Sequence, residues 1–122
     1  DVVKRWLAVA GWMAVIFYLS TMQVRADYGS AAPSAVHFVE YAILAVLVRW
    51  ASSGIVRASA ISLDFAAIIF ATIYGGSMEI AQRFVPTRSP DIMDALVNAA
   101  GALVGVVVPH LISSRKARSR DV

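Results

Sequence analysis

Residues 79–105 read EIAQRFVPTRSPDIMDALVNAAGALVG and join two long apolar runs. Pro86 predicts the end of the first run as a helix. Ser89, Pro90 and Asp91 predict the start of the next, because serine caps a helix, proline suits its first position and an acid complements its dipole. The stretch is also rich in polar side chains: Glu79, Gln82, Arg83, Arg88, Asp91, Asp94 and Asn98. Charge within or beside a membrane is costly, so such a cluster indicates a functional site.

Two further apolar runs stand earlier in the chain, so the sequence has four apolar runs in all. Each approaches the ~20 residues that a helix needs to cross the hydrocarbon of a bilayer. We predict one all-α domain over residues 1–122, a polytopic membrane protein whose four transmembrane helices form a compact bundle. The predicted segments are 6–23, 34–50, 58–84 and 90–113, and a mobile basic tail covers 114–122.

The composition supports a membrane protein. Of the 122 residues, 59% are apolar and 16% are charged, whereas soluble domains carry about 25% charged residues. There is no cysteine, which excludes disulfides and zinc-thiolate sites. The net charge of +3 is no nucleic-acid footprint, because the basic residues stand at the ends of apolar runs. We therefore predict membrane localisation and no nucleic-acid partner.

The basic residues also predict the orientation. Four crossings place both termini and the connection between the second and third segments on one side. Eight lysines and arginines fall on that side and three on the other. Because cytoplasmic loops carry the excess of Lys and Arg, both termini are predicted to be cytoplasmic.

This topology brings the polar residues to one depth near the non-cytoplasmic surface. The second and fourth segments begin at that end and the third finishes there. Three- and four-residue spacings place these side chains on helix faces that converge. The predicted ligand-binding residues are His37, Glu40, Glu79, Gln82, Arg88, Asp94 and Asn98. Asp64, at the opposite end of its segment, is expected to pair with an arginine there and to belong to no outer site. His110 is expected to be an interfacial residue, and the first segment, which has the fewest polar groups, to pack outside the trio formed by the other three.

Gly101 and Gly105 continue the face of Asp94 and Asn98. Two small residues four apart let a neighbouring helix approach closely. We expect this surface to serve a contact within the chain or a homo-oligomer.

Two blocks of residues resemble the VanZ-like family. The first is His37-Phe38-Val39-Glu40-Tyr41-Ala42-Ile43-Leu44, similar to the family pattern H-F-x-x-Y-x-x-L. The second combines Glu79-x-x-Gln82-x-Phe84-x-Pro86-x-Arg88-Ser89 with Asp94-x-x-x-Asn98-x-x-Gly101-x-x-x-Gly105. Leu19-Ser20-Thr21 is similar to the end of the family's first helix. The resemblance implies a small multi-helix membrane protein, in a family named for a link to teicoplanin resistance.

Three functions fit the polar residues. In the first, Arg88 pairs with a phosphate or carboxylate of an amphiphilic ligand, and the start of the fourth segment offers N–H groups to the same anion. Candidate ligands are a lipoglycopeptide such as teicoplanin, a polyprenyl-phosphate carrier or a phospholipid headgroup.

The second function is an intramembrane hydrolase or transferase acting on a lipid ester or phosphoester. A divalent metal would be held by His37, Glu40 and Glu79, or Glu79, the best catalytic candidate, would act as an acid–base group without metal. The third is structural or oligomer-forming: the polar side chains pair only with one another and tie the helices together, each bond contributing on the order of 1 kcal/mol.

Overall fold

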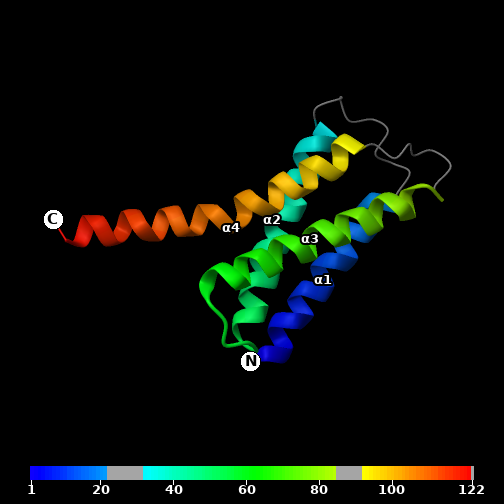
Figure 1. Cartoon of the computed structure of the whole chain (residues 1–122). Coiled ribbons are helices and arrows are strands. Elements are labelled where there is room, and N and C mark those ends of the chain that lie inside the picture. Colours follow the sequence, from blue (N-terminus) through cyan, green and yellow to red (C-terminus); the bar gives the residue numbers. More distant parts are fainter. Residues whose placement is uncertain (22–31, 85–91, 122) are drawn as a thin grey trace.

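The structure is a computed structural model that describes residues 1–21, 32–84 and 92–121. Four helices make up these ranges: α1 (Val2–Thr21), α2 (Ala32–Ser53), α3 (Ala60–Gln82) and α4 (Ile92–Arg120) (Figure 1). Each is long and apolar enough to cross a membrane. The predicted all-α, four-helix membrane fold is confirmed.

The helix boundaries differ from the predicted segments mainly at the C-terminal end. α4 stays helical to Arg120, through most of the stretch that we predicted as a mobile tail after residue 113. Lysine, arginine and alanine have high helix propensity, and cations near a helix C-terminus are favoured by its dipole. These local preferences are sufficient to continue a helix that is already nucleated.

α2 is the central helix of the bundle. It contacts all three other helices, whereas α1 packs on α2 and α3 and makes at most marginal contact with α4. Tyr41, Leu44, Ala45 and Val48 of α2 are fully buried. The polar and apolar parts of the core are therefore both built around one face of this helix.

Gly101 and Gly105 form the contact between α4 and α2. A Cβ atom added at Gly101 would collide with the backbone carbonyl of Phe38, and one added at Gly105 with that of Ala42. Glycine is required here because the two backbones touch. The glycine face thus makes a contact within the chain, one of the two contacts that we expected for it, and a homo-oligomer stays a prediction.

α4 crosses α2 obliquely and its C-terminal half leaves the bundle (Figure 1). From Val107 onwards every described residue of α4 is exposed. Pro109 lies in this part of the helix, where it removes one backbone N–H donor. The two helices therefore meet closely at the glycines and separate beyond them.

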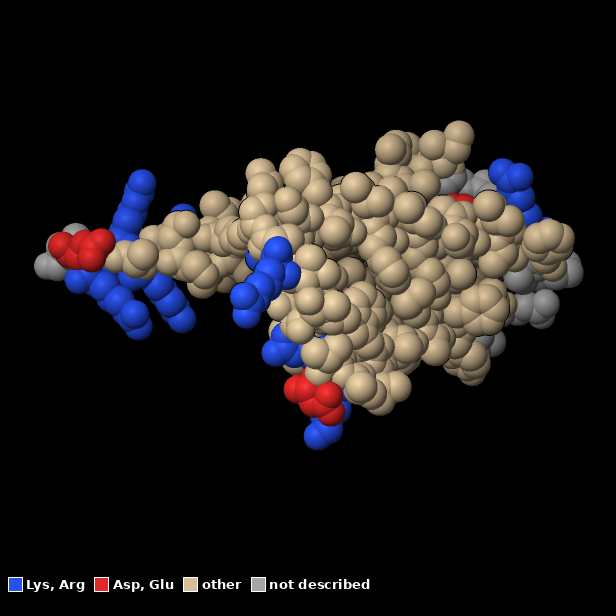
Figure 2. Space-filling model, turned by 60° about the horizontal axis from the view of Figure 1, so that its bottom comes forward, with Lys and Arg blue, Asp and Glu red and all other residues tan. Residues whose placement is uncertain are grey.

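Large apolar side chains cover much of the surface, including Phe17, Phe65, Ile69 and Ile73. In Figure 2, basic side chains gather along the protruding helix and at the ends of the bundle, while the surface between them carries no charge. Such a surface suits lipid rather than water. Which end faces the cytoplasm stays a prediction.

Candidate functional site

The helix directions bring the described candidate residues to one end of the bundle. His37 and Glu40 lie in the first turns of α2, Glu79 and Gln82 in the last turns of α3, and Asp94 in the first turn of α4. In Figure 1 these turns share the end that is opposite the N-terminus. Arg88 and Asp91 lie outside the described residues.

His37 and Glu40 form the α2 part of the site, and each is only 3% exposed. Nδ1 of His37 lies 3.4 Å from Oε2 of Glu40, one helical turn away. Trp12 of α1 donates its indole N–H to the backbone carbonyl of Glu40, at 2.9 Å. The pair is therefore buried, and α1 is bonded to the backbone of α2 at Glu40.

Tyr41 connects this pair to α3. Its fully buried side chain interacts electrostatically with Glu40, Tyr74 and Glu79. The rings of Tyr41 and Tyr74 are tilted, with centroids 6.4 Å apart. Tyr74 in turn donates its hydroxyl to the backbone carbonyl of Met13, at 2.6 Å. The half-buried carboxylate of Glu79 thus belongs to a cluster shared by α2 and α3.

Gln82 joins the site to α1. Its amide Nε2 donates to the backbone carbonyl of Ser20 over 3.4 Å, and both residues are buried. Sequence reasoning placed the first segment outside the polar trio. α1 instead supplies a donor from Trp12 and acceptors from Met13 and Ser20.

Asn98 completes the site from α4. Its side chain lies against Gly75 and Tyr41: a Cβ atom at Gly75 would sit 3.1 Å from Asn98 Nδ2 and 3.2 Å from Tyr41 Cε1. Asn98 is 2% exposed, and its Oδ1 has no hydrogen-bond partner among the residues that the structure describes. Asp94 lies one turn earlier and is half-buried.

The metal hypothesis requires three ligands that lie close together. Within residues 1–21, 32–84 and 92–121, no three histidine or acidic side chains are close enough together to hold an ion. His37, Glu40 and Glu79 are therefore not assembled as a ligand set. An acid–base role for Glu79 stays a hypothesis.

A second polar group lies at the opposite end of the bundle. Arg49 donates its Nε to Oδ1 of Asp64 at 2.6 Å, and Nε2 of His110 is 2.8 Å from Oδ2 of the same carboxylate. The expected pairing of Asp64 with an arginine is confirmed. His110 was expected only as an interfacial residue, and its contact with Asp64 depends on a helix crossing that spacing does not reveal.

The family of the chain follows from a comparison with family profiles. The profile described as VanZ/LLP1 matches residues 5–113, most of the chain. The chain belongs to the VanZ/LLP1 family. No curated protein and no solved structure shows significant similarity to it. The two VanZ-like blocks read from the sequence fall on α2 and across the ends of α3 and α4, so their described residues converge on the buried cluster around Tyr41.

Proposed function

We propose that this VanZ-family protein recognises an amphiphilic cell-envelope ligand at the outer leaflet, and thereby contributes to glycopeptide resistance or envelope homeostasis. The ligand is a lipoglycopeptide such as teicoplanin, or a lipid that bears a phosphate. Its polar part would contact residues from three helices and the connection before α4: His37, Glu40, Glu79, Gln82, Arg88, Asp94 and Asn98.

The Oδ1 atom of Asn98, which has no hydrogen-bond partner among the described residues, carries the proposal. A buried polar atom without a partner costs about 1–3 kcal/mol, and Asn98 Oδ1 is such an atom among the described residues. It lies beside Tyr41, which interacts with the carboxylates of Glu40 and Glu79. A ligand donor or a ligand-bound water that reaches Asn98 would offset this cost.

The experiment is a teicoplanin susceptibility assay in a host made resistant by expressing this chain. Glu79→Gln keeps the side-chain volume and removes the charge, so we expect it to abolish the gain in resistance at normal membrane levels. Ser77→Ala is the matched control, because Ser77 is exposed on the same helix and, among the described residues, its hydroxyl bonds only to the backbone carbonyl of Ile73. Full resistance with Glu79→Gln would contradict the proposal, and so would expression of the unaltered chain without any gain.

A structural role is the second candidate. The hydrogen bonds from Gln82 to Ser20 and from Tyr74 to Met13 tie α3 to α1, which favours a purely architectural cluster. The two candidate functions predict different thermal unfolding of the Glu79→Gln variant. A ligand site predicts that Glu79→Gln loses resistance while its unfolding midpoint in detergent is unchanged, whereas an architectural cluster predicts that both fall together.

A further inference from the structure

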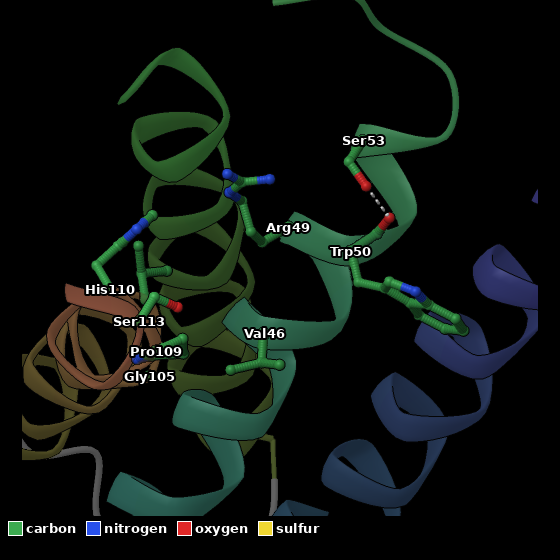
Figure 3. A pocket seen from close by; sticks show the side chains of 9 residues that line it. Val46, Arg49, Trp50, Ser53, Gly105, Pro109, His110 and Ser113 are labelled. Atoms are coloured by element: carbon green, nitrogen blue, oxygen red, sulfur yellow. Dashed lines mark hydrogen bonds between the residues drawn. The ribbon is translucent and has the colours of Figure 1, made fainter. Parts of the chain in front are cut away.

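A pocket of about 300 Å³ opens between α2 and α4 at the end of the bundle away from the polar cluster. It lies where the two helices separate beyond Gly105. In Figure 3, Arg49 of α2 and His110 of α4 stand on its two sides, with Ser113 one turn beyond Pro109. The polar lining is therefore at the surface end of the pocket.

An apolar cavity of about 220 Å³ continues the pocket toward the middle of the bundle. Both spaces are lined by Val46 and Gly105, and the apolar cavity adds Ala42, Ile43 and Leu47. Ala42, Val46, Arg49 and Ser53 follow helical spacing and so share one face of α2. Because both are lined by Val46 and Gly105, the two spaces adjoin, and we call them together the groove: its Ile43 end is apolar and its Arg49 end, the mouth, is polar.

At the mouth of the groove, Arg49 offers hydrogen-bond donors whose direction is fixed by its ion pair. Asp64 binds Nε of Arg49, which fixes the guanidinium but leaves its terminal N–H groups without a hydrogen-bond partner in the part of the chain that the structure describes. A guanidinium fork suits a phosphate, which it binds through two parallel hydrogen bonds. The side chain of Arg49 is 26% exposed, so these donors are accessible.

The charge around the mouth is positive only when the end of α4 is included. Asp64 offsets the positive charge of Arg49. The pair therefore orients a phosphate through hydrogen bonds but adds no net positive charge to attract it. Lys116 follows Ser113 by three residues and lies on the same helix face, next to Arg115. Basic side chains beside a membrane surface attract anionic lipid headgroups.

We propose that this groove binds one anionic phospholipid of the surrounding membrane. The phosphate lies against Arg49 and Ser113 within reach of Lys116, and one acyl chain follows Val46 and Gly105 toward Ile43. The site is separate from the polar cluster around Tyr41 and does not depend on the function proposed for that cluster.

The test is native mass spectrometry of the full chain, released from detergent with added phosphatidylglycerol or with phosphatidylcholine of the same acyl chains. We expect one phosphatidylglycerol to be retained in preference to phosphatidylcholine. Ser113→Glu places a negative charge at the phosphate position and should lower its retention about fivefold. Ser114→Glu makes the same charge change one position away, outside the groove, and should retain the lipid.

A second variant tests the acyl part of the groove without touching the ion pair. Val46→Trp fills the groove and should also lower phosphatidylglycerol retention. Val39→Trp is its control, since Val39 is exposed on α2 and lines neither cavity. All four substituted positions are exposed or on the groove wall, so normal unfolding midpoints are expected.

Three results would overturn the proposal. One is equal retention of the two lipids by the unaltered chain. Another is equal retention of phosphatidylglycerol by the groove variants and their controls. The third is binding of inorganic phosphate that Ser113→Glu blocks and Val46→Trp leaves intact, because the occupant would then be a soluble anion and not a lipid.

Discussion

At the scale of single residues, Asp64 holds together three helices with one side chain. Its two oxygens bind Arg49 of α2 and His110 of α4, while the residue itself belongs to α3. Hydrogen bonds that involve a charged group are stronger than neutral ones. Asp64 is therefore expected to contribute to stability, although Arg49 and His110 are partly exposed and their interactions are screened.

Asp64→Asn should lower the free energy of unfolding by about 1–2 kcal/mol, because the amide keeps one acceptor and loses the charge. The measurement is an unfolding titration with sodium dodecyl sulfate in mixed micelles. Asp121→Asn makes the same change in charge at the exposed end of the chain and should have no effect. Equal stability of the two variants would show that the interactions of Asp64 are not stabilising.

Gly105→Ala should destabilise the bundle by about 1–3 kcal/mol, the range for overpacking a close contact. The added methyl group meets the backbone of Ala42, which cannot rotate away. Gly76→Ala is the control, since a Cβ atom there has no neighbour within 4 Å in the described part of the chain. That variant should be neutral or gain up to about 1 kcal/mol through helix propensity. The same titration measures both, and a stable Gly105→Ala would refute the close helix contact.

At the scale of helices, the sequence predicted existence and type correctly, because length and apolar content determine both for a membrane segment. The end of α4 was predicted wrongly. The prediction ended the helix where the apolar run ends, whereas Arg115 and Lys116 continue it because hydrogen bonding and propensity, unlike membrane insertion, do not require apolar residues.

Removal of residues 115–122 should leave the bundle intact, because every described residue of this stretch is exposed. We expect an unchanged thermal unfolding midpoint in detergent. Binding of phosphatidylglycerol should weaken, since Lys116 and its basic neighbours are lost. Thermal unfolding and native mass spectrometry check the two parts, and a lowered midpoint would mean that the end of α4 packs on the bundle.

At the scale of the whole molecule, the convergence of the candidate site could be predicted because alternating helix direction puts the ends of α2, α3 and α4 at one surface. The hydrogen bonds that α1 makes to the site could not be predicted. Ser20 and Met13 contribute backbone carbonyls, which every residue has, so no side-chain pattern identifies them. The direction of Asn98 toward Gly75 likewise depends on helix rotation, which spacing leaves open.

The absence of cysteine permits a clean test of the orientation. Ala58→Cys and Ser119→Cys should be protected from a membrane-impermeant thiol reagent in intact cells, and Ser30→Cys should be labelled. This outcome follows from the excess of basic residues on the side of the termini. Labelling of residue 58 together with protection of residue 30 would reverse the topology and place the polar cluster at the cytoplasmic leaflet.

The oblique crossing of α4 also concerns bilayer thickness. A tilted helix advances less along the membrane normal than its own length, so it needs more residues than an upright one to traverse the same hydrocarbon. α4 has 29 residues against 20–23 in the other helices, or ~43 Å at 1.5 Å per residue. Residues 114–120 follow the apolar run, so this surplus is the basic end of α4, while its apolar part keeps the inclination imposed by Gly101 and Gly105. A thicker membrane would therefore be matched by drawing the basic end of α4 toward the headgroups, without rearranging the other three helices.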